Sequence, residues 1–197
     1  MKARRVKGLD ADGPLGDQLE RIVLIRTDEL FAFMPRAADR HEVAHLHDMR
    51  IAAKRLRYIL EIAEESFGPY APAASKRVKE LQDLLGEIHD CDVTLPRVLD
   101  LVARAREEDV RSARRRAGDA KDLEPRAASG GPNVQAYRGL ATLATYYQAR
   151  RELLFDRFIS FWDALQREGF RARLEYAAAE RPEPSHDPDA GAERSPP

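Results

Sequence analysis

The segment HEVAHLHDMRIAAKRLRY, which begins at His41, contains two groups of residues that can do chemistry, and they predict different ligands. Its first five residues follow the pattern H-E-x-x-H. On a helix, this spacing places the imidazoles of His41 and His45 one turn apart, where they can bind Zn²⁺ while Glu42 activates a water molecule. The first group therefore suggests a metal-dependent hydrolase.

A zinc site of this kind needs a third ligand, and the sequence offers none at a suitable place. The extended form of the motif requires glycine and histidine where this chain has Asp48 and Ile51. In another arrangement of zinc ligands the third ligand is a glutamate further along the chain, and Glu65 has the required separation from His45. An unbroken helix would, however, place Glu65 roughly 30 Å from His45. We therefore predict no bound metal, and we interpret His41 and Glu42 as the solvated start of a helix.

The second group consists of a histidine and basic residues that recur once per helical turn. Four of them lie on one side of a helix, at positions i, i+3, i+7 and i+10: His47, Arg50, Lys54 and Arg57. Arg55 lies to one flank of this strip. Cations spaced in this way repel one another unless carboxylates or a bound anion compensate. The spacing leaves two interpretations open, an anion site or a solvated helix face.

The next predicted helix repeats this pattern more weakly. Lys76 and Lys79 share one face, and Gly86 follows on the same helix. If the two helices pack antiparallel, their basic faces flank one groove.

The helices that would position these residues can be located from the spacing of apolar side chains. We expect helices over Leu15–Phe33, Val43–Ser66, Ala73–Ile88, a segment capped by Asp90 or Asp92, Val134–Gln166 and Phe170–Ala179. No segment of any length alternates as a strand would. The predicted fold class is all-α, an antiparallel helical bundle of about four to five helices with a long C-terminal helix.

The composition divides the chain into a bundle and two tails. Residues 1–14 are polar and predict a flexible N-terminal arm, and residues 15–179 form the bundle. Within the bundle, residues 117–133 are rich in glycine, proline and alanine and predict an internal loop. Residues 180–197 are rich in proline and charge and predict a disordered tail.

The overall charge gives no sign of a polyanionic partner. Lys and Arg number 33 against 34 Asp and Glu, for a net charge of −1, so such a partner must be argued from local clustering. The only cysteine, Cys91, excludes an internal disulfide. The sequence has no apolar run of about 18 residues and no apolar core of a secretory signal near Met1. We therefore expect a soluble, cytoplasmic protein.

Two motifs resemble a known family. His47-x-x-Arg50-x-x-x-Lys54-Arg55-x-Arg57-Tyr58 is followed by Leu81-Gln82-x-x-Leu85-Gly86-x-x-His89-Asp90-x-x-Val93. Together they closely resemble the CHAD family, whose name abbreviates conserved histidine α-helical domain. The resemblance is clearest over residues 43–93 and extends from about Leu15 to Leu174.

The resemblance implies a binding function. Family members are helical proteins whose basic surface binds inorganic polyphosphate, often at polyphosphate granules, so we expect no catalysis, no cofactor and no membrane contact. By motif position, the residues that would line the anion site are His47, Arg50, Lys54, Arg55 and Arg57, with Lys76 and Lys79 extending it. Gly86 would permit close helix approach, and Asp90 would cap a helix or orient a basic side chain.

The chain departs from the family pattern in one important way. Family domains usually contain two such repeats around one basic surface, and this sequence contains one, which makes it resemble a half-length member. A homodimer would rebuild the full groove, as twofold oligomers commonly do. We also expect no triphosphate-hydrolysing domain of the kind that many relatives carry.

Three other hypotheses remain at this point. Nucleic-acid phosphates would suit the basic strip, although a nucleic-acid partner is disfavoured because only Tyr58 among aromatic residues accompanies the cations. A metal-dependent enzyme would use His41, His45, His89, Asp90 and Asp92. The last hypothesis is a helical interaction module with a solvated basic face.

Overall fold

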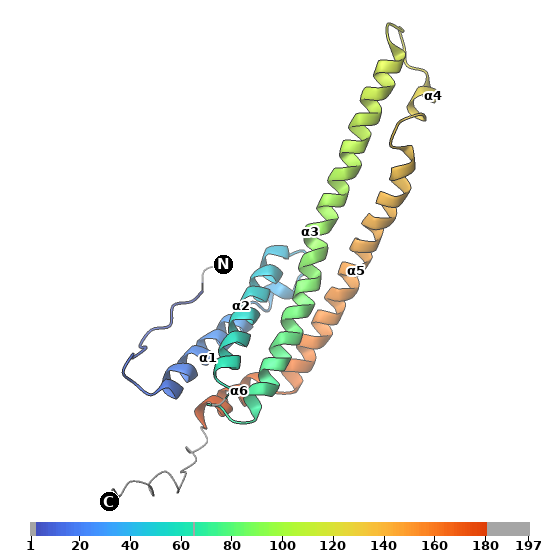
Figure 1. Ribbon diagram of the computed structural model, residues 1–197. Coiled ribbons are helices and arrows are strands. Elements are labelled where there is room, and N and C mark those ends of the chain that lie inside the picture. The colour runs from blue at the N-terminus through green and yellow to red at the C-terminus, as the bar shows by residue number, and fades with distance from the viewer. Residues whose placement is uncertain (1–2, 65, 181–197) are drawn as a thin grey trace, which may run out of the picture.

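The computed structural model describes residues 3–64 and 66–180, apart from the side chain of Ala128. The described residues contain helices and loops and no strand, which confirms the predicted all-α fold (Figure 1). In chain order the elements are α1 (Leu15–Phe31), η1 (Arg36–Ala38), α2 (Val43–Ile62), α3 (Tyr70–Ala117), α4 (Pro125–Ala128), α5 (Val134–Arg167) and α6 (Phe170–Ala179). The predicted disordered tail lies outside the described residues, except for Glu180.

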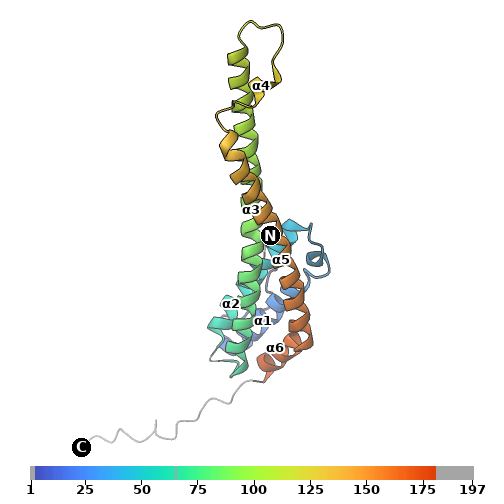
Figure 2. The same ribbon diagram turned by 90° about the vertical axis from the view of Figure 1, so that its right-hand side faces the viewer.

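The helices form a bundle with a long projection. The helices α1, α2 and α6 pack around one end of α3 and α5, and these two run side by side well beyond the bundle (Figures 1 and 2). The projecting ends are joined by residues 118–133, which include the short helix α4. We call the projecting part, from Leu99 in α3 to Ala144 in α5, the hairpin.

The predicted break near residue 90 is wrong, because α3 runs unbroken for 48 residues. An aspartate caps a helix only where the chain leaves helical geometry and its carboxylate accepts a backbone N–H. Asp92 instead accepts a hydrogen bond from the side chain of Arg151 in α5, at 2.6 Å from Nε. The helix also passes through Pro96, which lies in its interior.

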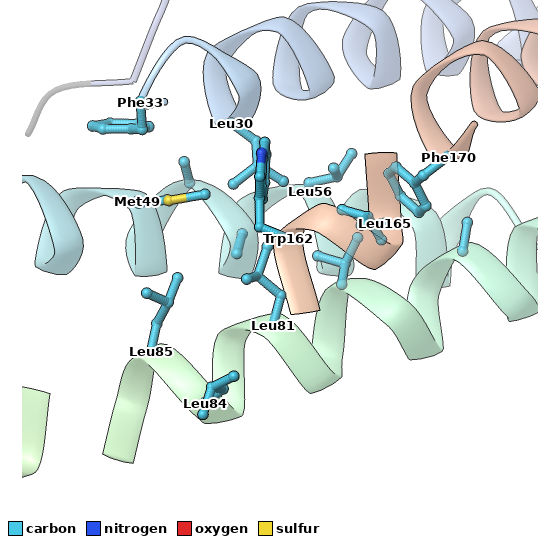
Figure 3. Close-up of a cluster of buried hydrophobic side chains, with 14 of the residues drawn as sticks. Leu30, Phe33, Met49, Leu56, Leu81, Leu84, Leu85, Trp162, Leu165 and Phe170 are labelled. Carbon is cyan, nitrogen blue, oxygen red and sulfur yellow. The ribbon is translucent and has the colours of Figure 1, made fainter. Parts of the chain in front are cut away.

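The bundle is held together by one apolar core to which α1, α2, α3, α5 and α6 all contribute (Figure 3). Its centre contains Leu30, Leu56, Leu81 and Leu165, each at most 1% exposed. Burying a leucine side chain stabilises a fold by about 1.5–3 kcal/mol. This shared core fixes how α2 lies against α3, and these two helices contain the basic residues.

The described part of the predicted N-terminal arm lies along α1. The backbone N–H of Asp10 donates to Gln18 Oε1 at 3.0 Å, and that of Arg4 donates to Glu29 Oε1 at 3.3 Å. Arg26 in turn donates to the carbonyl oxygen of Arg4 at 3.0 Å. The flexibility of the arm stays a prediction.

We expect the substitution Leu81→Ala to lower the free energy of unfolding by about 2–5 kcal/mol, because it opens a cavity in the middle of the core. Chemical denaturation followed by circular dichroism measures this loss. The control is Ile62→Ala at the end of α2, where the side chain is 65% exposed and the change should be within about 0.5 kcal/mol. Equal effects of the two substitutions would contradict the assigned core.

Candidate anion-binding site

Two contacts fix the register of α2 against α3. The imidazole rings of His47 and His89 lie 4.4 Å apart between their centroids. Three residues further along α2, the guanidinium of Arg50 crosses α3 at Gly86, where an added Cβ would lie only 3.3 Å from Arg50 Nε. The glycine therefore leaves the space that Arg50 occupies. Because residue numbers rise on α2 while they fall on α3, the two helices are antiparallel.

The same register brings the predicted basic residues of both helices to one surface. Seven residues, or two turns, beyond the contact between Arg50 and Gly86, Arg57 comes level with Lys79. Lys54 lies between Arg50 and Arg57 along α2 and is exposed, as are Lys76 and Lys79. We call this surface, formed by His47, Arg50, Lys54, Arg57, Lys76 and Lys79, the basic surface.

Few carboxylates of the protein compensate these charges. Arg57 Nε lies 3.4 Å from Glu61 Oε1, and its guanidinium also lies 4.7 Å from the ring centroid of Tyr58. The Lys54 ammonium lies 5.6 Å from the same ring centroid. Within residues 3–64 and 66–180, no carboxylate forms an ion pair with Arg50, Lys76 or Lys79. Within the described residues, most of the cationic side chains of the basic surface therefore have no carboxylate partner.

The basic surface also contains buried polar atoms that lack a hydrogen-bond partner. Among the described residues, six side-chain nitrogen or oxygen atoms are buried in this way, and four belong to this region: His47 Nδ1, Arg50 Nε, Arg57 Nε and Gln82 Oε1. Leaving a buried polar group unsatisfied costs about 1–3 kcal/mol. The described fold therefore leaves several polar groups of α2 and α3 without partners in one region.

His47 is held in its neutral form more strongly than an exposed histidine. Burial lowers its pKa from the ordinary value of 6.5, and the neighbouring His89 and Arg50 lower it further. Asp48 acts in the opposite direction without reversing the shift. An anion bound beside His47 would favour the protonated imidazolium. Proton uptake and anion binding at this position are therefore expected to be coupled.

Arg55, which the family motif assigns to the anion site, lies in a different environment. Its guanidinium donates to Glu29 Oε1 of α1 at 3.0 Å. Glu29 is almost completely buried, with 1% of its side chain exposed, and also pairs with Arg26 at 2.6 Å. Removing one partner of a buried ion pair leaves an uncompensated charge. This contact favours a role for Arg55 in joining α2 to α1, and its contribution to anion binding stays a prediction.

The residues of the H-E-x-x-H pattern pair with one another and with a nearby arginine. Glu42 accepts a hydrogen bond from Arg36 at 3.0 Å, and its other oxygen lies 3.0 Å from His45 Nδ1. The bond from Arg36 is the main cause of the lowered pKa of Glu42. Residues 3–64 and 66–180 contain no group of three or more side chains placed to hold a metal ion. His89 instead lies against His47, beside the basic surface.

The spacing of the basic residues alone does not predict two further residues of the site. Gln82 and His89 lie on the side of α3 that faces the basic residues of α2, one turn to either side of Gly86. The helical spacing of Gln82, Gly86 and His89 indicates that these three residues share one face of the helix. Only the register against α2 shows that they meet His47 and Arg50.

The fold and the site together define an all-α protein with a cationic surface between two antiparallel helices. The chain belongs to the CHAD family, because the family model of the CHAD domain matches residues 2–99, about half of the 197 residues. The match includes α1, α2 and the first part of α3, and therefore the whole basic surface. No curated protein and no solved structure matches the chain. In the described part of the chain, none of the helices combines the length and apolarity needed to cross a bilayer.

His47 predicts a specific pH dependence of stability. Above about pH 6.5 the imidazole is neutral in both the folded and unfolded states, so its full contribution to stability is present. As the pH falls below that value, the unfolded state takes up the proton first, and stability is lost toward the lowered pKa. Thermal denaturation between about pH 5 and 8 should therefore show a weaker loss on acidification for His47→Gln than for the wild type. The exposed His41→Gln variant should follow the wild type, and identical profiles for all three proteins would contradict the assignment.

Proposed function

We propose that this protein binds inorganic polyphosphate along the basic surface, as a binding protein without a catalytic step. The observation that supports this proposal most directly is the coincidence of unpaired cations with buried, unpartnered polar atoms on the same face of α2 and α3. The ligand would contact the six residues of the basic surface, and the inner groups Gln82 and His89 would lie beneath it.

The chemistry of the ligand matches these groups. Each internal phosphate unit of the polymer has about one negative charge and oxygen atoms that accept hydrogen bonds, and guanidinium groups bind such oxygens in pairs. The cations of α2 follow one another at about one per turn, or roughly 5 Å. A row of this kind suits a long, repetitive anion better than a single compact one.

The family resemblance also suggests where the protein is located in the cell and how its copies assemble. A cytoplasmic protein of this kind would be recruited to polyphosphate granules by the polymer itself. A homodimer would present two basic surfaces to one polymer, which raises the effective concentration of the second surface once the first is bound.

The backbone of a nucleic acid is the second candidate ligand. It is supported by Tyr58, which is 44% exposed beside Lys54 and Arg57 and offers a ring on which a base can stack. A single aromatic ring can stack with one base only, so most of the contacts of a nucleic acid here would be to its phosphates. We therefore expect polyphosphate to displace single-stranded RNA from the protein when both are supplied at equal phosphate concentration.

The double substitution Arg50→Glu/Arg57→Glu should weaken polyphosphate binding by at least about 100-fold, because each charge-assisted hydrogen bond contributes about 1.5–3 kcal/mol. Titration calorimetry across a salt series measures the loss, and the salt dependence should become shallower. The matched control is Arg138→Glu/Arg157→Glu in α5, which changes the net charge equally at exposed positions. If both double variants lose affinity equally, the assigned surface is wrong and only overall charge matters.

Gly86→Ala tests the geometry of the site rather than its charge. Alanine is favoured over glycine in a helix by about 1 kcal/mol, but here its Cβ would displace Arg50, so we expect little gain in stability and about tenfold weaker binding. Gly139→Ala in α5 is the control, because nothing lies within 4 Å of its added Cβ. It should stabilise the fold and leave polyphosphate binding unchanged. Wild-type affinity in Gly86→Ala would show that the position of Arg50 does not matter.

A further inference from the structure

The hairpin buries almost none of its own side chains. Between Val98 in α3 and Leu154 in α5, Ala113 is the one buried residue among those whose side chains the structure describes. Exposed apolar side chains are frequent there, and Val110 is 67% and Leu99 52% exposed. Amphipathic helices obtain most of their stability from burying an apolar face against other elements. Two helices that meet along one narrow seam leave much of that face in water.

Several of the exposed apolar residues, Leu99, Val110, Leu123 and Val134, line a groove on one side of the hairpin, whereas Leu101 and Leu143 lie outside it. The groove has a volume of about 900 Å³ and lies between α3 and α5. Leu99, Val102 and Val110 line it from α3, and Val134 and Ala141 line it from α5. Residues 134, 137, 141 and 144 recur at helical spacing, so α5 presents one continuous stripe to the groove. A groove between two helices, lined in this way, has the form that accepts further helices.

We propose that this groove is the interface of a homodimer, in which the hairpins of two copies pack face to face as a four-helix bundle. Each copy would then supply the two helices that the other lacks, and the apolar stripes of all four would enclose one core. The proposal rests on the hairpin alone and does not depend on the proposed ligand.

The outline of the hairpin has the order of size that a dimer interface needs. From Leu99 to Ala117 it is about 28 Å long, and two helices side by side are about 20 Å wide. This flat outline of roughly 560 Å² is smaller than the about 800 Å² that each partner buries in a complex of standard size, and the relief of the side chains adds accessible area to it.

The charges around the groove favour a second copy over a partner of another kind. Arg106 and Arg114 line it from α3, and Asp122 lines it from the loop at the tip. A twofold interface brings one patch against itself, so a patch that contains charges of both signs can be complementary to its own copy. A groove for an acidic partner would instead present cations only.

The proposed interface leaves the basic surface open. The groove begins at Leu99, ten residues beyond His89 along α3, which is about 15 Å of helix. Dimerisation would therefore join two copies at their hairpins while both basic surfaces remain accessible.

Sedimentation equilibrium of the full chain without polyphosphate tests this inference. We expect a dimer for the wild type and an at least 100-fold weaker dimer for Leu99→Glu/Val110→Glu. The control Ile62→Glu/Leu153→Glu places the same charges at two exposed leucine or isoleucine positions outside the groove and should stay dimeric. Circular dichroism checks that each variant is helical, and Val110→Ser serves as a milder variant if the charged one does not fold.

A monomeric wild type at every concentration would overturn the proposal, as would a groove variant that dimerises like the control. Because no polyphosphate is present, these outcomes are independent of the proposed function. A monomeric protein that binds polyphosphate would contradict the proposed interface and leave the proposed function intact. A dimeric protein that does not bind polyphosphate would contradict the proposed function and leave the proposed interface intact.

Discussion

The antiparallel packing of α2 on α3 is the constraint on which the other features of this protein depend. The apolar side chains of α2 enter the shared core, and this leaves its basic residues on the outer side beside α3. Gly86 lets Arg50 lie across α3, and the contact between His47 and His89 fixes the same register. The core therefore determines which cations of two separate helices share one surface.

Two nearby arginines of α2, Arg50 and Arg55, lie in opposite electrostatic environments. Arg55 is joined to the buried carboxylate of Glu29, where its charge is compensated and serves to connect α2 with α1. Arg50 has a buried Nε without a hydrogen-bond partner. A buried unpaired donor is costly in a fold that has no use for it, whereas a polyanion would satisfy it. This contrast between Arg50 and Arg55 is the physical basis for distinguishing the proposed ligand surface from a structural ion pair.

The two halves of α3 have different environments. Its first half is packed against α2, α5 and α6, and within the described residues the second half is packed against α5 and lies near α4 at the tip. The family match ends at residue 99, close to where the hairpin begins. The part of the chain that matches the family therefore contains the basic surface, and the projecting hairpin adds exposed apolar side chains.

The sequence alone determined the all-α class, the apolar face of α2 and the strip of cations opposite to it, because helical periodicity places residues around an axis without reference to neighbours. It did not determine that α3 continues past Asp90 and Asp92, since an aspartate is equally compatible with a cap or with a partner such as Arg151 in another helix. It placed Arg55 to one flank of the strip without showing that Arg55 pairs with Glu29, and it did not show that Gln82 and His89 lie beside His47 and Arg50. Those distinctions depend on which residues of other helices lie opposite, and only tertiary packing decides that.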